Sequence, residues 1–540
     1  MSTLSNTRLT CPGRLAITAL KGLFSYARLS LPLLLVACSG SSGTSPPPET
    51  QPAPATGLGK VNHIIVVMME NHSFDNYLGA LAYAAGSPYH ASSAACATDD
   101  HGCVDGLMCQ ADSNGGLVCS NSNPEDAGTA APAFHATSRC VVPDLDHSWP
   151  GSHREANFDD PNGTASNSPN DGFVRVNDAS DQPDNGVETP TDDATMGYYT
   201  QADLPFYYDL AQKFAIDDRY FSAVLGPTLP NRFYLLAATS FGHTTSGDSA
   251  PAGLFKPTTG TILDLLDGAG VSWTDYFQQA PQAENFRTPS GSATDPHFQS
   301  VQAFLASAAG TSAAAPLPQV SLVDPVFGGP DENDEHPPTD IQRGQVFVSR
   351  IVNAVRGGPY WQDSVIFIMW DEHGGFYDHV APPRAPQGGA RTPDGIFPGQ
   401  CADLSNPPAS QQPGGGVGCD LTLADVKALC PALAQSPASA YPENCASFDQ
   451  LGFRVPFLVV SPFAKRSYVS HTVGDHASML AFIAERFLKT APGGIRPHLT
   501  LRDQNADSLM DLFDFQNAPS LNTPVLQAQA PAVDCTPALN

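Results

Sequence analysis

Two short groups of polar residues, each directly after a largely apolar run, carry side chains that can bind a cation. The first motif, Glu70-Asn71-His72-Ser73-Phe74-Asp75, follows residues 63–69. The second motif, Asp371-Glu372-His373-Gly374-Gly375, follows residues 365–370. Carboxylate and amide oxygens are ligands of hard and borderline divalent cations. The two motifs therefore predict a metal site formed by three carboxylates and one amide: Glu70, Asn71, Asp371 and Glu372.

A third motif places a hydroxyl side chain just before a predicted helix over residues 231–240. Its sequence is Gly226-Pro227-Thr228-Leu229-Pro230-Asn231-Arg232. The amino end of a helix presents free N–H groups and favours an anion such as phosphate. Close to a metal, Thr228 could lose its proton and attack phosphorus; alternatively, it only caps the helix. Arg232 could bind phosphate or simply pair with an acidic residue.

Three histidines in polar segments could contact phosphate or supply the proton of a leaving group. They are His147 in Asp144-Leu145-Asp146-His147-Ser148-Trp149, His336 in Asp334-Glu335-His336-Pro337-Pro338, and His476 in Gly474-Asp475-His476-Ala477-Ser478. Each could instead make a structural hydrogen bond in a loop. We expect Asp378 and His379, a few residues further along, to stabilise the turn of the second motif.

The apolar runs before the first two motifs are rich in Ile and Val, which is typical of strands covered on both faces in a parallel sheet. In open α/β sheets, ligands bind beyond the carboxyl ends of such strands. Strands alternating with helices predict a mostly parallel sheet. Further strands are expected at residues 214–216, 271–273, 320–323 and 455–460, and further helices at 204–214, 261–267, 342–355 and 479–488.

The three motifs together resemble the bacterial phosphoesterase family, from about residue 62 to residue 488. That family groups secreted phospholipases C with a respiratory-burst-inhibiting acid phosphatase and belongs to the alkaline phosphatase-like superfamily. The resemblance implies an α/β fold: an α/β/α sandwich with a mostly parallel central sheet, here with Cys-rich loop insertions. It implies one divalent metal, whether Ca, Mn, Mg or Zn, and a nucleophile that is transiently phosphorylated. The implied metal ligands are Glu70, Asn71, Asp371, Glu372 and the nucleophile Thr228, and the implied substrate-binding residues are Asn231, Arg232 and His373.

Two residues differ between branches of that family or depart from its pattern. The family usually has Arg where this chain has His72, which leaves the metal pair intact. Thr at the position of the nucleophile resembles the phospholipase branch, because the acid phosphatase branch uses Ser. We therefore expect phospholipase C-type hydrolysis of a phospholipid phosphodiester. The alternatives are an acid phosphatase-type phosphomonoesterase and a non-catalytic surface binding protein.

The composition limits the partners. The formal net charge of the 540 residues is −28, which disfavours nucleic acid, since nucleic-acid binding needs a basic surface. The expected partner is a phosphate-ester small molecule or a phospholipid.

The amino-terminal segment resembles an export signal. Its residues 1–37 contain four basic and no acidic residues, and an apolar stretch too short to span a bilayer precedes Leu35-Val36-Ala37-Cys38. This ending resembles a lipobox, so we expect lipidation of Cys38 and attachment to a membrane through this N-terminal anchor. The expected location is the cell envelope, either periplasmic or on the outer surface, and the alternative is a secreted protein. We expect a tether at 38–59, the enzyme domain at 60–515 and a tail at 516–540.

Cysteines are grouped in two predicted insertions, at about 86–142 and 383–450. Twelve occur in the chain, and ten remain if Cys11 is removed with the signal and Cys38 carries lipid. An even number without any Cys-x-x-Cys pair indicates about five disulfides in an oxidising compartment rather than zinc sites.

Overall fold

The computed structural model describes residues 57–113, 116–125, 129–140, 144–157, 170–177, 192–247, 254–287, 296–311, 314–390, 392–396, 402–405, 447–490, 495–527 and 535. The predicted signal segment, the lipidation candidate Cys38 and nearly all of the predicted tether lie outside these residues. So does most of the predicted insertion at 383–450, with its four cysteines.

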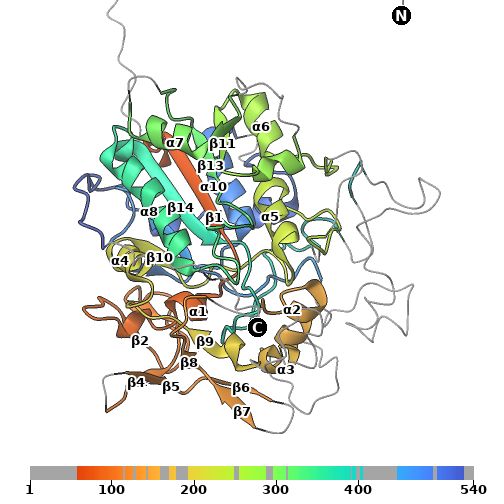
Figure 1. The fold of residues 1–540 in the computed structure, drawn as a ribbon. Helices are drawn as coiled ribbons and strands as arrows, with labels where there is room; N and C mark the ends of the chain where they lie inside the picture. The colour runs from red at the N-terminus through yellow and green to blue at the C-terminus, as the bar shows by residue number, and fades with distance from the viewer. Residues whose placement is uncertain are drawn as a thin grey trace, which may run out of the picture. The chain divides into compact units, whose positions relative to one another are not determined.

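An eight-stranded sheet forms the centre of the described chain (Figure 1). β15 is antiparallel to β14 and to β10, and every other neighbouring pair is parallel. The mostly parallel sheet predicted from the sequence is therefore confirmed. In spatial order the strands are β12 (Phe298–Ser300), β11 (Trp273–Phe277), β13 (Val320–Val323), β1 (His63–Met69), β14 (Ser364–Trp370), β15 (Phe457–Val460), β10 (Ala215–Asp217) and β16 (Tyr468–Ser470).

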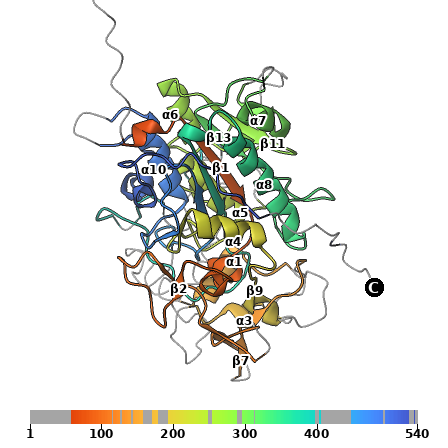
Figure 2. The ribbon, with the colours of Figure 1, turned by 90° about the vertical axis from the view of Figure 1, so that its left-hand side faces the viewer.

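Helices cover both faces of this sheet. Figure 2 shows α8 and α10 on opposite sides of β1. α7 and α4 pack against α8, whereas α5, α6 and α11 pack against α10, which gives the predicted α/β/α layering. The helices are α1 (Phe74–Leu78), α2 (Trp149–Ala156), α3 (Phe173–Val176), α4 (Pro205–Lys213), α5 (Thr228–Ala237), α6 (Ile262–Ala269), α7 (Val301–Ala308), α8 (Ile341–Gly357), α10 (His476–Phe487) and α11 (Leu501–Asn505).

Several boundaries differ from the predicted ones for local reasons. α5 begins at Thr228 rather than at residue 231, because Pro230 lies in the first turn, where a missing N–H costs nothing. α10 begins at His476, where Asp475 forms a capping box with Ser478. β11 continues to Phe277, beyond the predicted 271–273, since Thr274 and Asp275 are buried despite their polarity. α2 and α3 were not expected from the polar sequence around them.

The predicted Cys-rich insertion at 86–142 consists of short strands closed by two local disulfides, Cys96–Cys103 and Cys109–Cys119. A third disulfide joins Cys140 to Cys535, 395 residues further along the chain. Among the described residues, no helix has both the length and the apolarity to cross a bilayer. The strands here are β2 (His90–Ala91), β3 (Cys103–Val104), β4 (Cys109–Ala111), β5 (Leu117–Cys119), β6 (Ser122–Pro124), β7 (Ala130–Pro132) and β8 (Phe134–His135), the last paired with β9 (Gly197–Tyr198).

Candidate active site

The first and second motifs leave the sheet side by side. β1 and β14 are parallel neighbours in register from His63↔Ser364 to Met69↔Trp370, so Glu70 and Asp371 both follow the last paired residues. The backbone N–H of Asn71 donates to Oδ1 of Asp371 at 3.3 Å. A Cβ on Gly374 would lie 2.2 Å from the carbonyl oxygen of Asn71, so the close approach of the two motifs requires glycine there.

The four predicted ligands are buried and partly without partners, which fits a bound cation. Within the described residues, neither atom of the Asn71 side-chain amide has a hydrogen-bond partner, and neither has Oε1 of Glu372. Buried polar atoms are normally paired. Oε2 of Glu372, by contrast, accepts from the N–H of Gly374 at 2.7 Å. An amide oxygen and carboxylate oxygens in this arrangement are suitable donors for a divalent cation.

Arg232 balances part of this negative charge. Its Nε donates to Oδ2 of Asp371 at 2.9 Å, and its Nη2 lies 3.2 Å from Oε1 of Glu70. Burial raises the pKa of Asp371 to about 8, although the guanidinium opposes that shift. The sequence offered two roles for Arg232, phosphate binding or pairing with an acidic residue. In the structure Arg232 pairs with acidic residues, and these are the candidate ligands rather than surface groups.

Thr228 is the first residue of α5 and is partly exposed. The turn before it is shaped by Asn231, whose Oδ1 accepts from the N–H of Val224 at 3.0 Å. The Nδ2 of Asn231 donates to the carbonyls of Gly226 and Pro227. Because this buried amide is used by the backbone, Asn231 orients the helix start that carries Thr228. Four residues after Thr228, Arg232 ties the same helix to the two motifs.

His147 and His336 face each other across the carboxylate of Asp144. His147 Nδ1 lies 3.7 Å from Oδ1 of Asp144, and His336 Nε2 lies 3.8 Å from Oδ2. Each ring also donates Nδ1–H to a backbone carbonyl, of Leu145 and of Pro337 respectively. Burial opposes protonation of both rings, but nearby carboxylates outweigh this effect. At His147 these are Glu372 and Asp144. At His336 they are Glu70 and Asp144. The pKa of His147 is raised to about 10 and that of His336 is also raised, so both imidazoles can donate to an anion.

The other two candidate histidines are more deeply buried. His476 donates Nε2–H to the carbonyl of Asp371 at 2.7 Å, and burial lowers its pKa to about 4. His373 lies between two carboxylates, with Nε2 2.7 Å from Glu155 and Nδ1 3.4 Å from Glu372. Within the described chain both rings are therefore engaged by protein groups that surround the candidate ligands.

Comparison with known proteins agrees with this geometry. The model of the phosphoesterase family matches residues 61–488. The chain belongs to the phosphoesterase family. Phospholipase C B of Mycobacterium tuberculosis is 28% identical over 89% of this chain and 84% of its own length. Two relatives from Arabidopsis thaliana, non-specific phospholipases C6 and C1, are 26% and 27% identical over 86% of this chain and 74% and 73% of their lengths. The chain is thus a phosphoric ester hydrolase.

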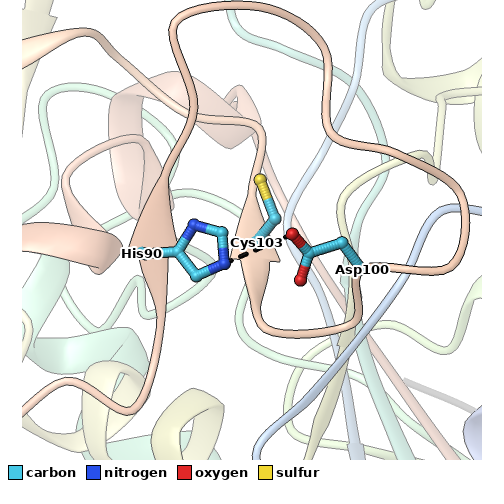
Figure 3. Close-up of side chains that lie close together, drawn as sticks. All are labelled: His90, Asp100 and Cys103. Atoms are coloured by element: carbon cyan, nitrogen blue, oxygen red, sulfur yellow. Dashed lines mark ion pairs between the residues drawn. The ribbon is translucent and has the colours of Figure 1, made fainter.

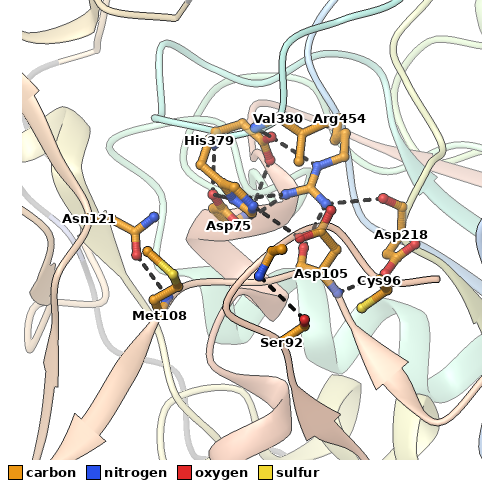
Figure 4. Close-up of polar contacts among 12 residues, drawn as sticks. Asp75, Ser92, Cys96, Asp105, Met108, Asn121, Asp218, His379, Val380 and Arg454 are labelled. Carbon is orange, nitrogen blue, oxygen red and sulfur yellow. Dashed lines mark hydrogen bonds and ion pairs between the residues drawn. The ribbon is translucent and has the colours of Figure 1, made fainter. Parts of the chain in front are cut away.

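A buried arginine, Arg454, joins the first motif to the segment that follows the second. Arg454 donates Nε to Asp378 at 2.9 Å and Nη2 to Asp75 at 3.1 Å, and its Nη1 donates to the carbonyls of Asp105 and Asp218 (Figure 4). His379 lies between the carboxylates of Asp75 and Asp105. The Arg454 network therefore links Asp75 of the first motif and Asp378, three residues beyond the second motif, to the Cys-rich insertion.

Sequence reasoning missed four residues that bear on the phosphoesterase site. Asp144 and Asp334 lie inside the histidine segments already singled out; the carbonyl of Asp334 accepts from the N–H of Glu70 at 2.9 Å. Nothing in the sequence marked Glu155 or Arg454, because neither belongs to a recognisable motif and the partners that matter, His373 and Asp75, are distant in the chain. Only their complete burial distinguishes them.

A second group of metal-compatible residues lies away from this site. His90, Asp100 and Cys103 converge in the Cys-rich insertion (Figure 3). However, the sulfur of Cys103 is bonded to Cys96, and the exposed pair His90 and Asp100 remains, at 3.3 Å. This group does not provide a thiolate ligand.

Proposed function

We propose that this phosphoesterase is a metal-dependent phospholipase C-type enzyme that hydrolyses a phospholipid phosphodiester through a phospho-Thr228 intermediate. The observation that carries the proposal is the parallel pairing of β1 and β14, which brings Asn71 and Glu372, with side-chain atoms unpartnered within the described residues, to one edge of the sheet, where Arg232 joins α5 to Glu70 and Asp371. The names of the similar proteins support a diester substrate. The ligand set would be Glu70, Asn71, Asp371, Glu372 and Thr228.

The cation, when bound, would offset charge on the phosphoryl oxygens and lower the pKa of the Thr228 hydroxyl. The Thr228 hydroxyl gives its proton to solvent as its oxygen forms a bond to phosphorus, and the bond from phosphorus to the glycerol oxygen breaks. His147 or His336 gives its proton to that leaving oxygen. Water then attacks the phosphorus of phospho-Thr228 and gives a proton to the now neutral histidine; the P–O bond to threonine breaks, the threonine oxygen takes a proton from solvent, and the phosphorylated head group leaves. Within the first turn of α5, Leu229 N–H donates to Ser246 Oγ and Pro230 has no N–H, so the N–H of Thr228 and the positive end of the helix dipole are what α5 offers the phosphoryl charge in both steps.

The remaining site residues act by holding these groups in place. Asn231 orients the start of α5 through the contacts of its amide with the preceding turn. Arg232 holds Asp371 and Glu70 as a pair, and His476 supports the backbone of Asp371. The oxygen-rich ligand set favours Ca, Mg or Mn, and Zn fits if a histidine joins the set.

The deciding experiment is hydrolysis of p-nitrophenyl phosphorylcholine and p-nitrophenyl phosphate by the mature chain and by Thr228→Ala, with and without chelator. We expect chelator-sensitive cleavage of the diester that disappears in Thr228→Ala. The matched control is Thr261→Ala, which removes the cap of α6 and leaves the site intact. Activity that survives in Thr228→Ala contradicts the nucleophile, and cleavage of the monoester alone favours the acid phosphatase alternative.

Export is supported by the three disulfides of the described residues, which are typical of an oxidising compartment. We further propose that Cys38 carries a lipid that anchors the enzyme to a membrane of the cell envelope. Mass spectrometry of the amino-terminal peptide from the native cell tests this directly. An unmodified Cys38 in a mature chain that retains it would contradict lipidation.

A further inference from the structure

A series of three hydrogen bonds and one ion-pair contact connects the loop of His147 with the candidate ligand Glu372. Its centre is Glu155 on α2, whose side chain is fully buried. Oε2 of Glu155 lies 2.7 Å from Nε2 of His373, and Nδ1 of the same ring lies 3.4 Å from Oε2 of Glu372. Both partners of this ring are carboxylates, so both of its nitrogens act as donors.

The second oxygen of Glu155 contacts the segment that carries His147. Oε1 accepts from Nδ2 of Asn177 at 3.0 Å. Oδ1 of Asn177 accepts from the backbone N–H of Asp146 at 2.8 Å. Asp146 directly precedes His147, so the same carboxylate contacts both halves of the site: the metal-binding motif on one side and the histidine loop on the other.

The contacts with His373 and Gly374 hold only one of the two carboxylate oxygens of Glu372. Its Oε2 receives both the His373 ring and the N–H of Gly374, whereas Oε1 has no partner within the described residues. The ring of His373 is itself held against Phe453, with the ring centroids 4.4 Å apart. With one oxygen of Glu372 held in this way, the other is turned toward the site.

Burial of Glu155 has a cost that its contacts only partly offset. A buried carboxylate is strongly unfavourable unless it is paired and hydrogen-bonded. No Lys or Arg ion pair to Glu155 is found among the described residues; His373 is its ion-pair partner. An apolar residue would fill this place in α2 at lower cost, so the carboxylate is better explained by what it orients.

We propose that Glu155 is a positioning residue of the phosphoesterase site. Through His373 it holds Glu372 with Oε1 directed at the cation, and through Asn177 it fixes the loop that carries His147. The inference rests on the proposed function, because it assigns Glu372 to the metal. Groups that hydrogen-bond to metal ligands in this way typically change metal affinity or activity by about 10- to 100-fold when they are removed.

The test is the dissociation constant of the metal alone, measured by titration calorimetry on the chelator-treated full chain with Ca, Mn, Mg and Zn. We expect Glu155→Ala to weaken binding of the preferred ion about 10- to 100-fold and Glu155→Gln, which keeps an acceptor for His373, to weaken it less. Asp209→Asn is the control: a buried helical carboxylate on α4 that pairs with Lys213 and accepts from the N–H of Gln527. Its metal affinity should equal that of the unaltered enzyme.

A purely structural role predicts a different pattern. In that case Glu155→Ala and Glu155→Gln lower the melting temperature while the metal dissociation constant stays unchanged, and the proposal is overturned. If Glu155→Ala does not fold, Glu155→Gln and Asn177→Ala provide the readout. Asn177→Ala cuts the branch to His147, together with the hydrogen bond from Asn177 to the Phe173 carbonyl, and leaves the His373–Glu372 branch in place, so kcat should fall with normal metal affinity. Failure of the unaltered enzyme to bind any of the four ions would instead contradict the proposed function itself.

Discussion

β1 and β14 place the candidate metal ligands by backbone pairing over seven residues, whereas His147 and His336 are held mainly by contacts of side chains with Asp144 and with local carbonyls. The first half of the site belongs to the rigid centre of the sheet, and its geometry is a property of the fold. The second half belongs to loops and depends on a few charged groups. Damage to the first half should abolish function, and damage to the second should tune it.

The largest effect is expected from Asp371→Asn. This change removes a candidate ligand and the main partner of the buried Arg232. Hydrolysis should be lost with the ligand, whereas the free energy of unfolding should fall by less than the about 3–5 kcal/mol typical of a buried ion pair broken from one side, because Glu70 still faces Arg232 and the raised pKa of Asp371 keeps its carboxyl largely protonated near neutral pH. Denaturant unfolding and the diester assay measure the two effects. Retention of metal binding in this variant would contradict the ligand assignment.

Arg454→Met should come next, because it leaves Asp75 and Asp378 without their buried partner. We expect a loss of about 3–5 kcal/mol in the free energy of unfolding and weaker metal binding. The control is Arg287→Met. Arg287 and its partner Asp267 are both about one third exposed, and such a pair contributes about 0–1 kcal/mol. Equal losses in the two variants would show that the Arg454 network does not join the first motif to the segment after the second.

Asp144→Asn should have a moderate effect, concentrated in the pH dependence. The Asp144 carboxylate raises the pKa of both His147 and His336, so its neutralisation lowers both values. The protonated form of each ring is then lost at a lower pH. The alkaline limb of the kcat/KM profile should therefore move toward lower pH, and metal affinity should be nearly unchanged. A profile that superimposes on that of the unaltered enzyme would remove these histidines from the proton transfer.

The smallest effect on catalysis is expected from the double substitution of Cys109 and Cys119 by Ser. Their disulfide closes the β4–β5 hairpin of the Cys-rich insertion, and its loss should cost about 2–4 kcal/mol in the free energy of unfolding. Because the Arg454 network contacts the insertion at Asp105, not at this hairpin, kcat should be preserved. A large fall in kcat below the unfolding temperature would show that the hairpin supports the site.

The same contrast between sheet and loops explains which features of the fold and site could be predicted from the sequence. The two strands and their motifs were predictable, since long apolar runs ending in carboxylates have few alternative structures. Thr228 at a helix start was predictable from its flanking prolines, although Pro230 hid the first turn of α5. α2 and α3 were missed because the sequence around them is polar. These helices are buried by partners that lie far away in the chain.

The roles of individual polar groups were harder to predict than their positions. Asn231 and His476 are used by backbone groups of the third motif and of Asp371, which no spacing rule specifies. Glu155 and Arg454 have no local pattern at all. Their importance follows from contacts with residues more than 200 positions away, and such contacts are visible only after the chain is folded.

The order of the strands also constrains how the molecule is made. β1 is the first strand of the sheet to be synthesised, yet its neighbours β13 and β14 are completed only at residues 323 and 370, and Cys140 meets Cys535 only after 395 further residues. During synthesis β1 therefore remains an apolar segment without its sheet neighbours, exposed to aggregation. Chaperones and disulfide catalysts should accordingly limit the yield of this protein more than its final stability does.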